Sequence, residues 1–148
     1  MNNDNFNSKY PVDPSRYRAL VGRLLPRIIE QIFQELGFDV RVDLIQNNGV
    51  DLTVFNNANE VFLVGEILNW SPYSLLSRKR KECIKTNLCN YDCKRVLFYT
   101  AMENDYLLES LHNKNIDLLC LDNQVLPKDF FDKVKVSIVN FVRVWYVV

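Results

Sequence analysis

The chain has 148 residues, with 18 basic and 18 acidic side chains and a formal net charge of zero. Such a balance excludes nucleic-acid binding driven by overall charge, so only a local basic cluster could contact phosphates. With 48% hydrophobic and 12% aromatic residues, the chain can bury a core and is not of the disordered class. Its length predicts one domain, residues 13–148, after a frayed polar arm, residues 1–12.

Neither targeting nor membrane insertion is expected. The N-terminal MNNDNFNSKY lacks the apolar region of a signal peptide. The most apolar stretch, 134–148, is interrupted by Lys135, Asn140 and Arg143 and is shorter than the roughly 20 residues of a membrane span. We therefore expect a cytoplasmic protein that does not contact a membrane.

The cysteines favour reduced thiols over a metal site. Their spacing forms no C-x-x-C pair, and the chain has one histidine; they are Cys83, Cys89, Cys93 and Cys120. A structural zinc site requires ligands at closer spacing. A disulfide between Cys89 and Cys93 remains an alternative in an oxidising compartment.

A long amphipathic helix is predicted first, over 14–36. Asp13 and Pro14 form an N-cap followed by a proline at the first helical position. Apolar residues then recur at three- and four-residue spacing until Gly37, which is expected to end the helix. Pro26 is assigned to the polar side, where it should kink the helix.

The strands that follow predict an antiparallel meander. Residues 38–45 alternate between apolar and polar side chains, and an Asn-Asn-Gly turn at 47–49 leads into a strand over 50–55. The strand over 61–68 is apolar at nearly every position and should lie centrally in the sheet. A helix over 74–88, capped by Ser74, comes next.

The second half of the chain alternates strands with helices. We expect strands over 94–100 and 116–121, with a helix over 103–113 between them. The tail from Pro127 fits a helix better than a strand, turning extended near its end. The fold class is therefore α/β, a mixed central sheet flanked by helices.

Two acidic residues stand out in this order of elements. Asp51 opens one strand and Glu66 lies near the end of the next, so an antiparallel pairing places them opposite each other on one face. Neighbouring carboxylates repel unless a proton or cation lies between them, and Mg²⁺ suits such a pair. The alternative is structural: Asp51 finishes the turn, and Glu66 pairs with Arg41 or another base.

The helix, then GVDLTVF, a turn, EVFLVGEI, a basic helix and VLFYT resemble the restriction-endonuclease-like (PD-(D/E)xK) nucleases, and archaeal Holliday junction resolvases in particular. The resemblance covers about residues 14 to 122. It implies a nuclease with Mg²⁺ or Mn²⁺ bound by Asp51 and Glu66. It also implies a lysine that positions or activates water.

The motif departs from that family at two positions. Leu68 stands where the motif has lysine, so an amine would have to come from the following helix, with Lys85 as the candidate. The acid expected on the first helix is also displaced, since Glu30 is the nearest and Arg27 lies near the expected place.

A basic cluster follows the carboxylate pair. Residues 78–95 contain two acids, Glu82 and Asp92, and seven basic residues: Arg78, Lys79, Arg80, Lys81, Lys85, Lys94 and Arg95. Such clusters contact phosphates, although a charged helix face can also be merely solvated. Trp70, Tyr73 and Tyr91 lie around it and could stack on bases or simply pack.

The sequence therefore predicts a metal-dependent endonuclease that acts on DNA rather than RNA, with Asp51, Glu66 and Lys85 as catalytic residues. The alternative is a catalytically inactive protein of the same fold that binds DNA or serves in assembly. A third alternative is a homodimer built on the apolar tail, which includes Phe141, Val144, Trp145, Tyr146 and Val147.

Overall fold

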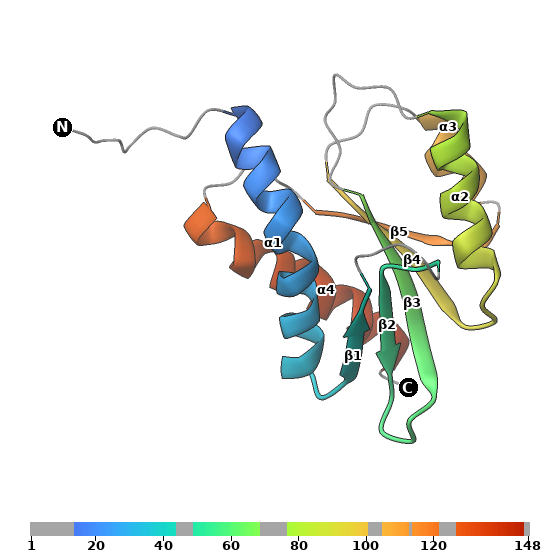
Figure 1. Cartoon of the computed structure of the whole chain (residues 1–148). Helices are drawn as coiled ribbons and strands as arrows, with labels where there is room; N and C mark the ends of the chain where they lie inside the picture. Colours follow the sequence, from blue (N-terminus) through green and yellow to red (C-terminus); the bar gives the residue numbers. More distant parts are fainter. Residues whose placement is uncertain are drawn as a thin grey trace.

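A computed structural model describes residues 14–43, 49–68, 77–100, 105–112, 114–121 and 127–146. Its elements are α1 (Pro14–Glu35), β1 (Asp39–Val42), β2 (Leu52–Phe55), β3 (Val61–Leu68), α2 (Arg78–Cys89), β4 (Lys94–Tyr99), α3 (Asp105–His112), β5 (Asp117–Cys120) and α4 (Pro127–Tyr146). The strands form one five-stranded sheet in the order β1-β2-β3-β4-β5. The predicted α/β class, a mixed sheet flanked by helices, is confirmed (Figure 1).

The first three strands form the predicted antiparallel meander. Strand β1 pairs with β2, and β2 pairs with β3, both antiparallel. The turn between β2 and β3 is closed by Asn56, whose Oδ1 accepts hydrogen bonds from the backbone N–H of Ala58 and Glu60. Asn59 takes the left-handed backbone conformation, with φ of 63°, which asparagine tolerates better than most residues.

The remaining strands are parallel, because a helix connects each of them to the one before. Strand β4 pairs with β3 in parallel after α2, and β5 pairs with β4 in parallel after α3. Strand β3 therefore lies at the centre and is buried at Leu63, Val64, Gly65 and Glu66. The predicted position of residues 61–68 at the centre of the sheet is confirmed.

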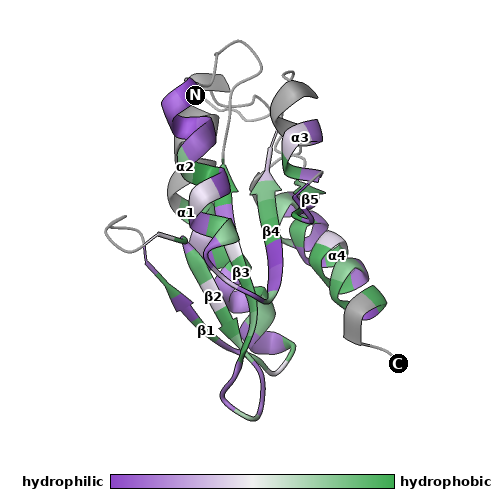
Figure 2. Cartoon of the chain, turned by 90° about the vertical axis from the view of Figure 1, so that its right-hand side faces the viewer, coloured by the Kyte–Doolittle hydropathy of each residue, from purple (hydrophilic) through white to green (hydrophobic). Residues whose placement is uncertain are grey.

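Helices cover the two faces of the sheet in pairs (Figure 1). On one face, α1 and α4 enclose a core of large apolar side chains that includes Ile29, Phe33, Phe98 and Ile138. On the other face, α2 and α3 enclose a smaller core that includes Val64, Ile84, Leu88 and Leu97. Figure 2 shows β2 and β3 coloured mainly hydrophobic, as expected for strands between two layers.

The structure corrects three details of the predicted helices. In α1, Leu24 is 46% exposed, whereas Pro26 is buried rather than on the polar side. Helix α2 begins at Arg78 with Ser77 as its N-cap, whose hydroxyl accepts from the Arg80 N–H at 3.1 Å; the predicted cap, Ser74, lies outside the described residues. Helix α4 stays helical to Tyr146, so the predicted extended end is wrong over these residues.

The apolar tail is partly accounted for by this last helix. Val142 is buried against the core, and Phe141 packs against its edge, whereas Val144 is 76% exposed. Val147 lies outside the described residues. Among the helices that the structure describes, none is long and apolar enough to cross a membrane.

Candidate functional site

The sheet register brings Asp51 and Glu66 together. Leu52 pairs with Gly65, and the Asp51 N–H donates to the Gly65 carbonyl at 3.1 Å. One further step along this antiparallel register places Asp51 opposite Glu66. Directly opposed residues of an antiparallel pair point to the same face, which here is the face covered by α2 and α3.

Asp51 is held in place by the strand next to it. Its side chain is almost fully buried, and its Oδ2 accepts a hydrogen bond from the Ile67 N–H at 2.9 Å. Its backbone carbonyl accepts from the Asp43 N–H at 2.9 Å. Asp51 therefore links the end of β1 with β3, and its carboxylate is directed toward β3.

Glu66 is fully buried, and its two carboxylate oxygens differ. Oε2 accepts from the side-chain amide of Asn87 on α2 at 3.1 Å, and the same amide nitrogen lies 3.3 Å from the Gly49 carbonyl. Within the described residues, Oε1 accepts no hydrogen bond from an N–H donor, and the guanidinium of Arg80 reaches it, with Nη2 at 3.8 Å. The Glu66 carboxyl group also interacts with the Asp51 carboxyl group beside it.

The two carboxyl groups cannot both be charged without compensation. Burial raises the pKa of Glu66 to about 8, and the charge of Asp51 adds to that increase. Burial also raises the pKa of Asp51, although the hydrogen bond from the Ile67 N–H partly opposes this. At neutral pH, therefore, Glu66 keeps a proton and hydrogen-bonds to Asp51. A bound cation would replace that proton.

The structure places Arg80, rather than Lys85, beside the carboxylate pair. The Lys85 amine forms an ion pair with Glu82 at 2.9 Å and donates to the Ser110 hydroxyl of α3 at 3.2 Å. Arg80 lies one turn earlier in α2 and is the base nearest Glu66. Strand β3 contributes no base at the position of the motif lysine, where Leu68 is buried in the core with Ile84.

The other basic residues are divided between two locations. Arg78 and Lys79 are exposed in the first turn of α2, where Lys81 is half-buried. Lys94 starts β4 and forms an ion pair with Asp117 of β5. The exposed basic surface beside Glu66 is thus the start of α2, which Figure 2 shows as hydrophilic.

The remaining sequence-based alternatives can now be located. Arg41 lies over the Phe55 ring, 5.7 Å from its centroid, so the base that reaches Glu66 comes from α2 instead. Glu30 pairs with Arg27 along the surface of α1, at 2.9 Å, on the opposite face of the sheet. Trp70 and Tyr73 lie outside the described residues. All four cysteines are free thiols.

Asn87 is a site residue that the sequence interpretation missed. Arg80, Ile84 and Asn87 follow each other at spacings of four and three residues, which places them on one face of a helix. Because Ile84 is buried against the sheet, its polar neighbours on that face point toward Glu66. The three–four spacing around an apolar residue was therefore a usable signal.

These groups suit a hard divalent cation. Asp51 and Glu66 would supply carboxylate oxygens, and Mg²⁺ commonly takes one or two carboxylates and keeps several waters. Within the described part of the chain, no cluster of three or more acidic, histidine or cysteine side chains could hold a metal. Two carboxylates match the small number of protein ligands that Mg²⁺ commonly takes.

Comparisons of the chain with protein-family models, with curated proteins and with solved structures gave no match.

Proposed function

We propose that this protein is a metal-dependent nuclease of the restriction-endonuclease-like fold that hydrolyses phosphodiester bonds in DNA. Asp51 and Glu66 would hold Mg²⁺ or Mn²⁺, and the ion would supply a more acidic bound water and stabilise charge on the phosphate. The observation that supports this most is the buried pair of carboxyl groups on adjacent strands.

The order of elements supports the fold assignment. A helix, three antiparallel strands, a helix and a parallel strand follow each other from Pro14 to Tyr99, which is the order that the sequence resemblance implied. The carboxylates lie on the second and third of these strands, as in the family motif. The fold alone specifies no activity, so the site must support the function.

Arg80 takes the role that Lys85 was expected to have. A guanidinium cannot act as a base at neutral pH, because its pKa is above about 12. It can bind a phosphate oxygen through two hydrogen bonds and stabilise developing negative charge. Asn87 orients Glu66 and fixes the Gly49 carbonyl beside it, so α2 supplies two positioning groups.

The exposed start of α2 would extend the contact with DNA. Arg78 and Lys79 are exposed next to Arg80, and clustered basic side chains bind the phosphate backbone without reading its sequence. Lys81 could add a contact, while Lys94 is engaged by Asp117. The nucleic acid would therefore lie across the start of α2 beside Glu66.

Cleavage of supercoiled plasmid with Mg²⁺ or Mn²⁺ tests this function. We expect Asp51→Asn and Glu66→Gln to abolish cleavage, Arg80→Ala to reduce it by about 100-fold, and Lys85→Ala to leave it nearly unchanged. Glu109→Gln, an exposed acid of α3, is the matched control. Absence of cleavage by the wild-type protein with either metal would exclude the enzyme.

A second candidate is a DNA-binding protein of this fold without catalysis. The specific observation in its favour is Leu68, which is buried where the family motif has lysine. This candidate predicts salt-dependent DNA binding through α2 without strand cleavage. The plasmid assay combined with a gel-shift measurement separates the two candidates.

A further inference from the structure

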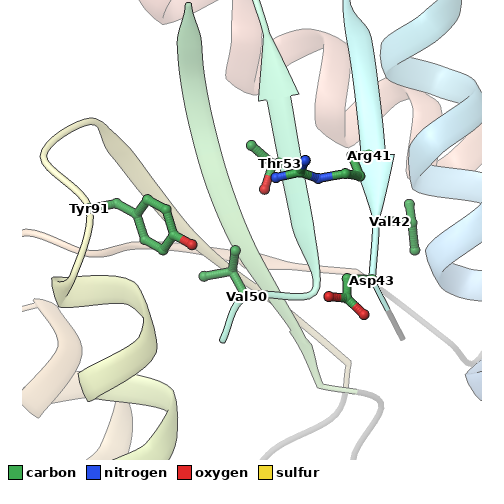
Figure 3. Close-up of a pocket in the computed structure, with 6 residues that line it drawn as sticks. All are labelled: Arg41, Val42, Asp43, Val50, Thr53 and Tyr91. Atoms are coloured by element: carbon green, nitrogen blue, oxygen red, sulfur yellow. The ribbon is translucent and has the colours of Figure 1, made fainter. Parts of the chain in front are cut away.

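A pocket of about 280 Å³ opens between the ends of β1 and β2 and the connection from α2 to β4 (Figure 3). It is lined by Arg41, Val42, Asp43, Val50, Thr53 and Tyr91. The volume lies just below the range of roughly 300–1,000 Å³ typical of pockets for drug-sized ligands. It therefore suits a single flat group of the size of a nucleobase rather than a base pair.

The walls of this pocket combine opposite charges with an aromatic ring. Arg41 pairs with Thr53 across β1 and β2, and Asp43 follows Arg41 by two residues, so these three side chains share one face. Tyr91 reaches in from the connection between α2 and β4, with its hydroxyl toward the strands, and Val50 lies between (Figure 3). A cation, a carboxylate and a phenol thus surround an apolar floor.

The pocket lies near the proposed catalytic centre, although neither Asp51 nor Glu66 is among its lining residues. The Asp43 N–H donates to the Asp51 carbonyl at 2.9 Å, and Thr53 lies two residues beyond Asp51 on the same face. The charge of Asp43 also acts on the Asp51 carboxyl group. A ligand in the pocket would therefore lie next to any phosphate bound at Asp51 and Glu66.

We propose that this pocket binds one unpaired guanine base. Guanine presents two adjacent donors, N1–H and the N2 amino group, beside the acceptor O6, and a single carboxylate can accept from both donors. Asp43 would accept these two hydrogen bonds, Arg41 would donate to O6, and Tyr91 would contact the base plane or edge. Enzymes that bind an extruded base combine edge hydrogen bonds with aromatic contacts in the same way.

Adenine and cytosine fit these groups less well. Adenine offers one amino donor next to the N1 acceptor, whose lone pair would face the Asp43 carboxylate. Cytosine likewise places the N3 and O2 acceptors beside its amino group. A buried or half-buried carboxylate that meets a lone pair loses its hydrogen bond without replacement, so discrimination in favour of guanine follows.

The pocket could bind guanine whether or not the protein is a nuclease. Only the statement that this guanine flanks the cleaved phosphate rests on the proposed function. The test is therefore carried out with the full chain in EDTA, where no metal-dependent cleavage occurs. Fluorescence anisotropy compares a labelled oligothymidylate containing one central dG with the same strand containing dA. GMP and AMP serve as competitors.

We expect the dG strand to bind about tenfold more tightly than the dA strand, since a two-bond contact discriminates by roughly 1–3 kcal/mol. Asp43→Asn should bring the ratio close to one, and Tyr91→Leu should weaken both strands. Asp129→Asn, an exposed acid of α4, is the matched control. Arg41→Gln, which should also lower the ratio, provides a second variant if Asp43→Asn does not fold, as judged by circular dichroism.

GMP could compete for binding where AMP does not, even if the two strands bind equally. If Asp43→Asn abolishes this competition, the result supports guanine binding. It also indicates that the ligand is a free nucleotide rather than a base within a strand. Equal binding of both strands together with no competition by GMP overturns the proposal. Neither result depends on plasmid cleavage, so failure of the nuclease proposal is recognised separately.

Discussion

At the scale of single residues, Glu66 determines the chemistry of the site. It is the fully buried acid of the sheet, and its carboxyl group is in direct contact with Asp51, Asn87 and Arg80 through hydrogen bonds or charge. A pKa near 8 means that the neutral form is favoured in the absence of a cation. The site thus contains an unfavourable interaction that a bound cation would relieve.

This property gives stability a defined pH dependence. The pKa of Glu66 rises from 4.5 to about 8 on folding, so between these values the folded state binds more protons than the unfolded state. The free energy of unfolding should therefore decrease as pH rises through this window. Above pH 8 the folded protein contains a buried charged pair and is least stable.

Glu66→Gln should remove this pH dependence. In EDTA we expect the variant to be more stable than the wild type at about pH 9 by on the order of 2–4 kcal/mol, at roughly 1.4 kcal/mol per pKa unit, and similar to it at about pH 5. Urea denaturation at the two pH values measures the difference. The exposed Glu109→Gln control should show none, and a wild-type stability that increases from pH 5 to pH 9 would contradict the account.

Gly65 contributes through the side chain that it lacks. A Cβ atom built on Gly65 would lie 2.7 Å from Cε2 of Phe98, a distance that the packed core cannot accommodate without movement. Gly65→Ala should therefore destabilise the protein by about 1–3 kcal/mol.

A double-mutant cycle with Phe98→Leu identifies the cause of this loss. If the clash is responsible, Gly65→Ala should cost less in the Phe98→Leu background than in the wild type, as measured by urea denaturation. Equal costs in the two backgrounds would show that contact with Phe98 does not determine the effect.

At the scale of elements, helix α2 has two functions. Ile84 and Leu88 are buried against the sheet, while Arg80 and Asn87 on the neighbouring positions contact Glu66. The first turn of the helix remains exposed and basic. One helix therefore completes the second core and positions the acid; under the proposed function, its basic first turn would also contact a nucleic acid.

The exposed turn of α2 should determine the salt dependence of DNA binding. We expect the double variant Arg78→Gln, Lys79→Gln to weaken binding and to reduce the slope of log K against log salt by about 2, because each phosphate that a basic side chain neutralises adds roughly 0.9 to that slope. The matched control is Lys114→Gln, Lys133→Gln, which removes two exposed lysines elsewhere. An unchanged slope in the α2 variant would place the nucleic acid on another surface.

The sequence predicted these elements better than it predicted their orientation. Residues 61–68 were assigned to a strand with the observed bounds because the apolar run is bordered by a turn on one side and a polar residue on the other. The face of α1 was misjudged at Pro26, because the neighbouring apolar pairs Leu24–Leu25 and Ile28–Ile29 leave the direction of the buried stripe ambiguous. Packing against α4 and the sheet decides it.

The same limit applies to the site. Asp51 and Glu66 could be paired from strand parity and hairpin geometry alone, because both are local. The choice between Arg80 and Lys85 could not be predicted from the sequence, because it depends on how α2 is rotated about its axis against β3. Lys85 directly follows the buried Ile84 and points toward α3, where its amine donates a hydrogen bond to the Ser110 hydroxyl.

At the scale of the whole molecule, a central strand between two cores makes the site rigid. Strand β3 is paired on both sides, antiparallel with β2 and parallel with β4, and is covered by helices on both faces (Figure 1). The carboxylate of Glu66 therefore has little freedom to move away from Asp51. If the site binds a cation, as proposed, its ligands would already be in place.

The central claim is that Asp51 and Glu66 bind a divalent cation, and titration of Mn²⁺ followed by electron paramagnetic resonance tests it most directly. We predict that Mn²⁺ binds saturably to the wild-type protein and that Mg²⁺ displaces it. Binding should strengthen as pH rises toward about 8, because the proton on Glu66 must leave. Glu66→Gln and Asp51→Asn should each abolish binding. The Glu109→Gln control should bind as the wild type does. Binding that is absent from the wild type, or that persists unchanged in Glu66→Gln, would contradict the account.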